Sequence, residues 1–193
     1  MRRAPATAVA LLALVLAALL AACGGSSNAL PSPRSFDLGL APPAAKLPPV
    51  RVLAVRASAP FDGTEMHYRL AWRDAGELAA FANSRWAAAP PELVRKSVMR
   101  ALPAFGNPPC GLALDVQEFT QVFAAKDSSE ARIELRALLL NASGVRVASR
   151  GVSVTEPNAG ADAPSGAAAF GRATDRALAE LSAWISAQAA CRS

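Results

Sequence analysis

The sequence is poor in the side chains from which active sites are built. It has one histidine, His67, and three cysteines, and it contains no Cys-x-x-Cys, His-Glu-x-x-His, Gly-x-Gly-x-x-Gly, Walker or Gly-x-Ser-x-Gly motif. These absences argue against zinc sites, phosphate-binding loops and the nucleophile elbow of α/β-hydrolases. Carboxylates such as Asp115, Glu118, Glu134 and Glu180 are scattered, and the sequence pairs no two of them for acid–base chemistry. We therefore predict no catalytic centre, no metal site and no cofactor.

Net charge is also low once the first residues are set aside. The whole chain has 20 Lys and Arg against 15 Asp and Glu, a formal charge of +5. Without Arg2 and Arg3 the basic residues fall from 20 to 18 and the charge falls to +3. So small an excess does not favour a nucleic-acid partner.

Long apolar runs are confined to the start of the chain. Arg2 and Arg3 precede an apolar stretch over residues 8–22, which is shorter than the about 20 residues that a transmembrane helix needs. A basic start, an apolar centre and small residues before a cleavage point are typical of a secretory signal peptide, which we place at residues 1–22. A retained anchor helix is the alternative interpretation.

The first cysteine follows this apolar run directly. Leu20-Ala21-Ala22-Cys23 resembles the bacterial lipobox, in which the cysteine sulfur receives a diacylglycerol and the freed amine is acylated after cleavage, commonly with palmitate. Two or more acyl chains give stable anchoring, at about 0.8 kcal/mol for each buried CH₂. Gly24 rather than Asp follows the cysteine, which by resemblance to Gram-negative sorting favours the outer membrane. We predict Cys23 as the lipidated first residue of the mature protein, facing the periplasm.

The other two cysteines, Cys110 and Cys191, then form a pair in an oxidising compartment. A disulfide between them would close a loop of about 80 residues and stabilise the fold by about 4–5 kcal/mol in the chain-entropy model. Two buried free thiols are the alternative.

Composition divides the mature chain into a tether and one domain. Residues 23–35 carry the lipidated cysteine followed by small, polar and proline residues, which are typical of a flexible tether. Residues 36–193 have the length of a single domain, and a second proline-rich piece at 41–49 makes regular structure sparse before Val50.

Hydrophobic patterning predicts a mixed sheet covered by helices. A short helix with Asp74 as its N-cap is expected over 75–84, and a second helix is expected from Pro90 to about Leu102. A long final helix is expected over 163–190, with Asp162 or Ser165 as its cap. The strands are expected at 50–57, 65–72, 112–123, 132–140 and 145–155. The order β-β-α-α-β-β-β-α indicates a single α/β (α+β) domain, with a mixed sheet of about five strands and two to three helices packed on it.

A series of short motifs, taken in order and spacing, resembles the ABC-type transport auxiliary lipoproteins, a PqiC-like family that accompanies MCE-domain proteins. The resemblance covers nearly all of the mature chain. The points of match are the lipobox, Phe36-Asp37-Leu38-Gly39, Met66-x-Tyr68-Arg69, Arg85-Trp86 followed by Pro90-Pro91, Val116-Gln117-Glu118-Phe119 with Phe123 beyond it, and an Ala-rich final helix ending near Trp184.

The resemblance implies a non-catalytic periplasmic protein tethered to the outer membrane. Its expected partners are an MCE-domain protein and an ABC permease, which move lipids or other hydrophobic molecules between membranes. A homo-oligomer is also possible. The fold that the resemblance implies, a mixed sheet with helices packed on it, agrees with the element order.

Two surfaces are candidates for partner binding. One is the outward face of the strand pair at 132–155, where Arg132 and Arg136 alternate with apolar residues and Arg146 and Arg150 follow the turn; a merely solvated face is the alternative. The second comprises Tyr68, Arg69, Arg85 and Trp86, because Trp, Tyr and Arg dominate interface energetics. Composition alone instead places Trp72 and Trp86 in the core, with the Tyr68 hydroxyl at its rim.

Three functions are compatible with the sequence to different degrees. The first is the transport auxiliary lipoprotein. The second is a free-standing lipid-binding or outer-membrane assembly lipoprotein, which should enclose an apolar cavity. The third is an envelope hydrolase, against which the residue inventory argues.

Overall fold

Strand β5 (Cys110–Ala125) is the centre of the sheet in the computed structural model, which describes residues 32–104, 108–158 and 160–191. On one edge β5 pairs antiparallel with β6 (Ser128–Asn141), and β6 pairs antiparallel with β7 (Arg146–Asn158). On the other edge it carries two parallel strands in succession. β2 (Arg51–Ala57) pairs with its first half, and β3 (Glu65–Leu70) pairs with its second half.

The sheet continues beyond β3 through two more strands. β4 (Ala79–Trp86) pairs antiparallel with β3, and β1 (Arg34–Phe36) pairs parallel with β4. The result is a seven-stranded mixed sheet with the order β1-β4-β3-β5-β6-β7 and with β2 beside β5. The mixed sheet of the α+β prediction is confirmed, but the prediction of about five strands is too low.

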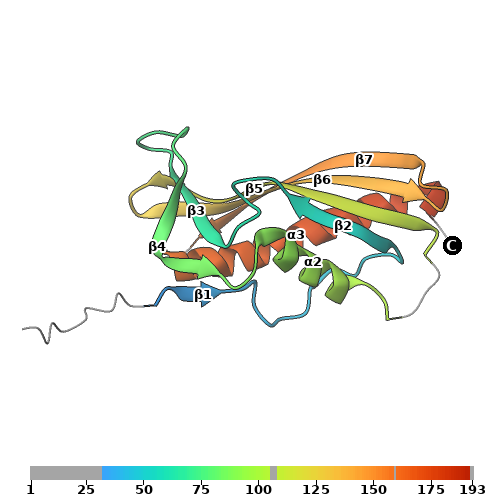
Figure 1. The fold of residues 1–193 in the computed structure, drawn as a ribbon, viewed down its shortest axis with the longest axis horizontal. Helices are drawn as coiled ribbons and strands as arrows, with labels where there is room; N and C mark the ends of the chain where they lie inside the picture. Colours follow the sequence, from blue (N-terminus) through green and yellow to red (C-terminus); the bar gives the residue numbers. More distant parts are fainter. Residues whose placement is uncertain (1–31, 105–107, 159, 192–193) are drawn as a thin grey trace, which may run out of the picture. The chain divides into compact units, whose positions relative to one another are not determined.

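Both described α-helices cover the same face of this sheet (Figure 1). α2 (Pro90–Ala101) begins with two prolines, which fit the first turn because their missing N–H groups have no partner there anyway. α3 (Ala163–Ala187) is capped by Asp162, whose carboxylate accepts from the Ser165 backbone N–H at 2.9 Å. Each helix buries one apolar side, which includes Leu93, Val94 and Val98 in α2 and Phe170, Leu178 and Leu181 in α3.

The core lies between the helices and one face of the strands. At its centre three aromatic rings meet: Trp86 of β4 lies edge-on to Phe119 of β5 and to Phe170 of α3, with ring centroids 5.4 and 5.2 Å away. Phe119 and Phe170 stack at 4.4 Å. Side chains alternate between the two faces along a strand, so the residues next to these core positions point to the opposite face of the sheet, away from the helices.

The predicted disulfide is present in the structure. Cys110, the first residue of β5, is bonded to Cys191, at the end of a 3₁₀ turn (Ala189–Cys191) that follows α3. Their Cα atoms lie 5.3 Å apart. The bridge therefore fastens the end of the final helix to the start of the central strand.

One predicted element is wrong. The helix expected over 75–84 is absent, and most of its residues belong to β4. The alanine-rich sequence has helical propensity, but pairing with β3 on one edge and β1 on the other gives it a place in the sheet. The short β1 was also missed. Trp72, expected in the core, is 45% exposed, and Lys126 lies 5.6 Å from its ring centroid.

The predictions for the start of the chain lie outside the described residues. They are the signal peptide at 1–22, the lipidation of Cys23 and most of the tether at 23–35. In the described part of the chain, neither helix is both long enough and apolar enough to cross a membrane.

Candidate functional site

The sheet face opposite the helices is uncovered over β2, β5, β6 and β7, and we call it the open face (Figure 1). Strand register places its residues in three rows that run across these four strands. The rows, from β2 to β7, are Arg51, Gly111, Leu140 and Arg146; then Ala54, Ala113, Leu138 and Ser149; then Arg56, Asp115, Arg136 and Gly151. The residues between the rows, such as Leu112, Leu114 and Leu139, are buried under the helices.

Each of the outer two rows contains two arginines, and the middle row is small or apolar. The centre is made more apolar by Leu53, which a β-bulge places over Gly111 and which is 45% exposed. A Cβ on Gly111 would lie 2.5 Å from a methyl carbon of Leu53, so only glycine permits this contact. The open face therefore has an apolar centre with guanidinium groups at its margin.

Part of this margin is hollowed. Arg136, Arg146 and Arg150 line a depression of about 450 Å³ together with Leu138, Ser149 and Gly151. Within the described ranges none of these three arginines makes an ion pair or a side-chain hydrogen bond, and the same holds for Arg51 and Arg56. Their positive charge is thus not neutralised by contact with a carboxylate in that part of the chain.

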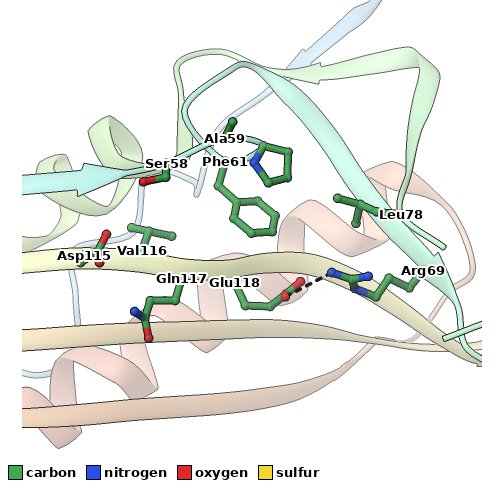
Figure 2. Close-up of a pocket in the computed structure, with 10 residues that line it drawn as sticks. Ser58, Ala59, Phe61, Arg69, Leu78, Asp115, Val116, Gln117 and Glu118 are labelled. Carbon is green, nitrogen blue, oxygen red and sulfur yellow. Dashed lines mark hydrogen bonds and ion pairs between the residues drawn. The ribbon is translucent and has the colours of Figure 1, made fainter. Parts of the chain in front are cut away.

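A second hollow lies farther along β5, where β2 has ended and β3 has not yet begun to pair (Figure 2). It measures about 350 Å³, and its lining includes Phe61 and the bulged segment 116–118 of β5. Arg69 and Glu118 form an ion pair at 3.4 Å within it. The Glu118 carboxylate also accepts from the Thr120 hydroxyl. We call this hollow the β5 cleft.

The chemistry available in the β5 cleft is limited. Glu118 is already engaged by Arg69 and Thr120, which leaves it poorly placed to act as a free base. His67, on β3, packs edge-on against Phe61 with ring centroids 5.8 Å apart, and burial lowers its pKa below the ordinary value of 6.5. Among the described residues, no group of three His, Cys, Asp or Glu side chains is placed to hold a metal ion.

The predicted surface of Tyr68, Arg69, Arg85 and Trp86 is not one surface. Neighbouring residues of a strand point to opposite faces, so Tyr68 and Arg69 separate on β3, and Arg85 and Trp86 separate on β4. Tyr68 packs against the rings of Phe81 and Phe123, whereas Arg69 enters the β5 cleft. Arg85 is exposed, but Trp86 is only 1% exposed and belongs to the core. Trp86 is therefore removed from the candidate interface.

The other predicted surface, the outward face of the strand pair at 132–155, is brought together in part. Arg132 and Arg136 both lie on the open side of β6, but Arg132 is paired with Glu130 at 3.1 Å. Arg136 instead joins Arg146 and Arg150, as the turn between β6 and β7 led us to expect. The sequence analysis missed the contribution of β2, whose arginines at 51 and 56 share the face. The Val-rich pattern of that strand was the available signal, because apolar residues on both faces are typical of a strand inside a sheet.

Two solved structures have a similar fold. One is the crystal structure of a protein from Xanthomonas campestris, which is 28% identical, has a TM-score of 0.62, and is matched over 79% of this chain and 91% of its own. The other, an uncharacterized protein, is 13% identical at the same TM-score of 0.62, with 80% of this chain and 99% of its own covered, and shows the fold alone. No curated protein matches the chain significantly.

A family model matches the chain over residues 38–185, from the loop after β1 almost to the end of α3. This range contains the open face, the β5 cleft and both described helices. The family model is described as that of an ABC-type transport auxiliary lipoprotein component, and this description names no enzymatic activity. The chain belongs to the family of ABC-type transport auxiliary lipoprotein components.

Proposed function

We propose that this protein is the outer-membrane-anchored, periplasmic auxiliary subunit of an ABC/MCE-type system that moves lipids or other hydrophobic molecules between membranes. The observation that carries the proposal is the family match over residues 38–185, preceded by a lipobox at Cys23. Membership of the family supports an association with ABC-type transport. The lipobox before the domain supports a lipid anchor.

The distance between anchor and domain supports this arrangement. Ten residues, 24–33, separate the lipidated cysteine from β1, and a chain of that length can span at most about 35 Å. A domain on such a tether stays close to the membrane and remains able to turn a broad face toward a partner. Gly24 in the position after the lipidated cysteine favours the outer membrane over the inner one.

The described surface fits a binding role better than a catalytic one. Its most distinctive feature is a broad sheet face with an apolar centre and arginines in no ion-pair contact, rather than a cleft with converging nucleophile and base. Arginine and exposed aliphatic side chains are typical components of protein interfaces.

Membrane crosslinking followed by purification tests the proposal. Full-length protein with a C-terminal tag, crosslinked in its native envelope, should co-purify an MCE-domain protein or an ABC permease subunit. The matched control is Cys23→Ala, which should lose both the acyl mass on the leading residue and most of the crosslinked partner. Recovery of neither subunit from the wild-type protein would contradict the proposal.

A second measurement separates the proposed role from that of a lipid carrier. Native mass spectrometry of the domain without its anchor should show the bare polypeptide mass. Retention of a bound lipid by that domain would instead favour a free-standing lipid-binding lipoprotein.

A further inference from the structure

We propose that the open face binds an acidic amphipathic helix of a partner protein, laid across strands β2, β5, β6 and β7. The inference deepens the proposed function, because it names the surface and the chemistry through which such a subunit would be recognised.

The positive charge on this face is compensated only in part. Arg51, Arg56, Arg136 and Arg146 lie on this face, on three strands, and none has an ion-pair partner among the residues that the structure describes. The three rows contain one carboxylate, that of Asp115, which is not in ion-pair contact with the arginines on either side of it. Elsewhere the same chain pairs its arginines readily, as at Arg172 and Arg176, which both bind Glu156. An acidic partner would supply the missing counter-charge.

The spacing of the rows matches the width of a helix. The rows that contain Gly111 and Asp115 are four residues apart along β5, which is about 13 Å at about 3.3 Å per residue. An α-helix with its side chains is about 10–12 Å in diameter. A helix lying on the middle row would therefore have an arginine-bearing row along each side.

The length of the strip also suits a short helix. Four strands at about 4.8 Å spacing extend over about 14 Å, and an α-helix covers that length in about nine residues at 1.5 Å per residue. The floor of the strip is low because three of its four residues, Ala54, Ala113 and Ser149, are small. Leu53, which is 45% exposed, and Leu140 give it an apolar contact surface.

The apolar strip favours a protein partner over an anionic lipid surface. A lipid headgroup needs only the guanidinium groups, and it would leave the exposed aliphatic side chains between the two arginine rows without a partner. An amphipathic helix uses both features, with an apolar stripe on Leu53 and Leu138 and acidic residues on either side. The acidic Glu134, which lies in the next row beyond Arg136, ends the basic region and gives the surface a defined boundary.

Site-specific photocrosslinking in the full-length lipoprotein tests this inference. A benzoylphenylalanine in place of Ser149, which lies in the middle row and is exposed, should crosslink in the native envelope to one peptide. Mass spectrometry should identify that peptide as an acidic segment with apolar residues at helical spacing. The double charge reversal Arg136→Glu with Arg146→Glu should lower the crosslink yield at least tenfold, and Arg51→Glu with Arg56→Glu should do the same from β2.

The matched control changes the same charge elsewhere. Arg73→Glu with Arg95→Glu alters two exposed arginines that are not on the open face, and it should leave the yield within twofold of wild type. Circular dichroism melting checks that each variant is folded. Lysine substitution of the acidic residues in the identified peptide should restore crosslinking to the charge-reversed protein.

Other outcomes would overturn the inference. These are a crosslink to lipid alone, a crosslink to a second copy of the chain, a peptide without acidic residues, or an unchanged yield in both charge-reversed variants. Binding of the domain to vesicles of anionic phospholipid but not to phosphatidylcholine, lost on charge reversal, would assign the face to a membrane surface. If an MCE or permease subunit still co-purifies while charge reversal has no effect, the proposed function stands and the docking surface is wrong. If the acidic helix belongs to an unrelated protein, the docking surface stands and the proposed function is wrong.

Discussion

The backbone carbonyl oxygen of Leu38 lies against Gly171 of α3, and the two are too close for a side chain to fit between them. A Cβ added at Gly171 would lie 2.8 Å from that oxygen. The contact holds the segment after β1 on the final helix. Arg100 of α2 secures the next residues of that segment, because its guanidinium donates to the backbone carbonyls of Gly39, Leu40 and Ala41.

Gly171→Ala should therefore destabilise the domain, although alanine is the better helix former by about 1 kcal/mol. The added methyl group must displace a backbone oxygen, and overpacking of this kind costs about 1–3 kcal/mol. We expect a net loss of about 1 kcal/mol, measured by urea unfolding. Gly151→Ala is the control, because a Cβ there meets nothing within 4 Å. Equal stability of the two variants would show that the Leu38 contact is unimportant.

The bridge between Cys110 and Cys191 should contribute a large part of the stability. The two residues are 81 positions apart, and closing a loop of that length is worth about 4–5 kcal/mol in the chain-entropy model. Cys110→Ala with Cys191→Ala should lower the free energy of unfolding by about that amount. Both cysteines are buried, so the protein from the periplasm should first be denatured without reduction and shown to lack free thiols. Two reactive thiols there would refute the bridge.

The aromatic cluster predicts which core substitution is most damaging. Phe170 contacts both Trp86 and Phe119 and is 1% exposed. Phe170→Ala should lower the free energy of unfolding by about 3–5 kcal/mol, because it removes a buried ring and leaves a cavity. Phe170→Leu retains most of the volume and should cost clearly less. Urea unfolding of both variants checks the order, and a reversed order would mean that the ring contacts are not formed as described.

The elements predicted correctly from the sequence are those with hydrophobic patterns that extend over many residues. The β5, β6 and β7 strands and both described helices have stripes or alternations that extend over many residues, and all five were found within a few residues of their ends. The segment Ala79–Trp86 was not predicted as a strand, because its alanines favour a helix and its strand conformation depends on pairing with β1 and β3. Such pairing is a tertiary effect that a local pattern does not contain.

The candidate site could be predicted only in part, for a related reason. Arg136, Arg146 and Arg150 come from neighbouring strands joined by a short turn, so their proximity follows from local sequence. Arg51 and Arg56 are about 90 residues away from them in the chain and reach the same face only because β2 pairs with β5. Arg85 and Trp86 failed as a joint surface because strand alternation separates neighbours, a rule that applies only once β4 is known to be a strand.

Glu156 gives a prediction that depends on pH. This carboxylate, on β7, accepts from the Nε of Arg172 at 2.8 Å and from the Nη1 of Arg176 at 3.0 Å, and so ties the edge strand to α3. The hydrogen bond from Arg172, with that from Arg176, lowers the pKa of Glu156 below its ordinary value of 4.5. A lowered carboxyl pKa stabilises the fold above the unfolded pKa, and this contribution is lost as pH falls through the folded pKa.

Glu156→Gln should therefore be less stable than wild type near pH 7, by about 1 kcal/mol because both arginines are half exposed and screened by solvent. The difference should shrink as pH falls below the ordinary value of 4.5 and vanish once the wild-type carboxyl is protonated. Urea unfolding from about pH 7 to about pH 3 measures it. Glu77→Gln, at an exposed carboxylate without an ion-pair partner in the described part of the chain, should change stability little at any pH. A deficit in Glu156→Gln that stays constant across this range would mean that side-chain shape, not the charge on Glu156, links β7 to α3.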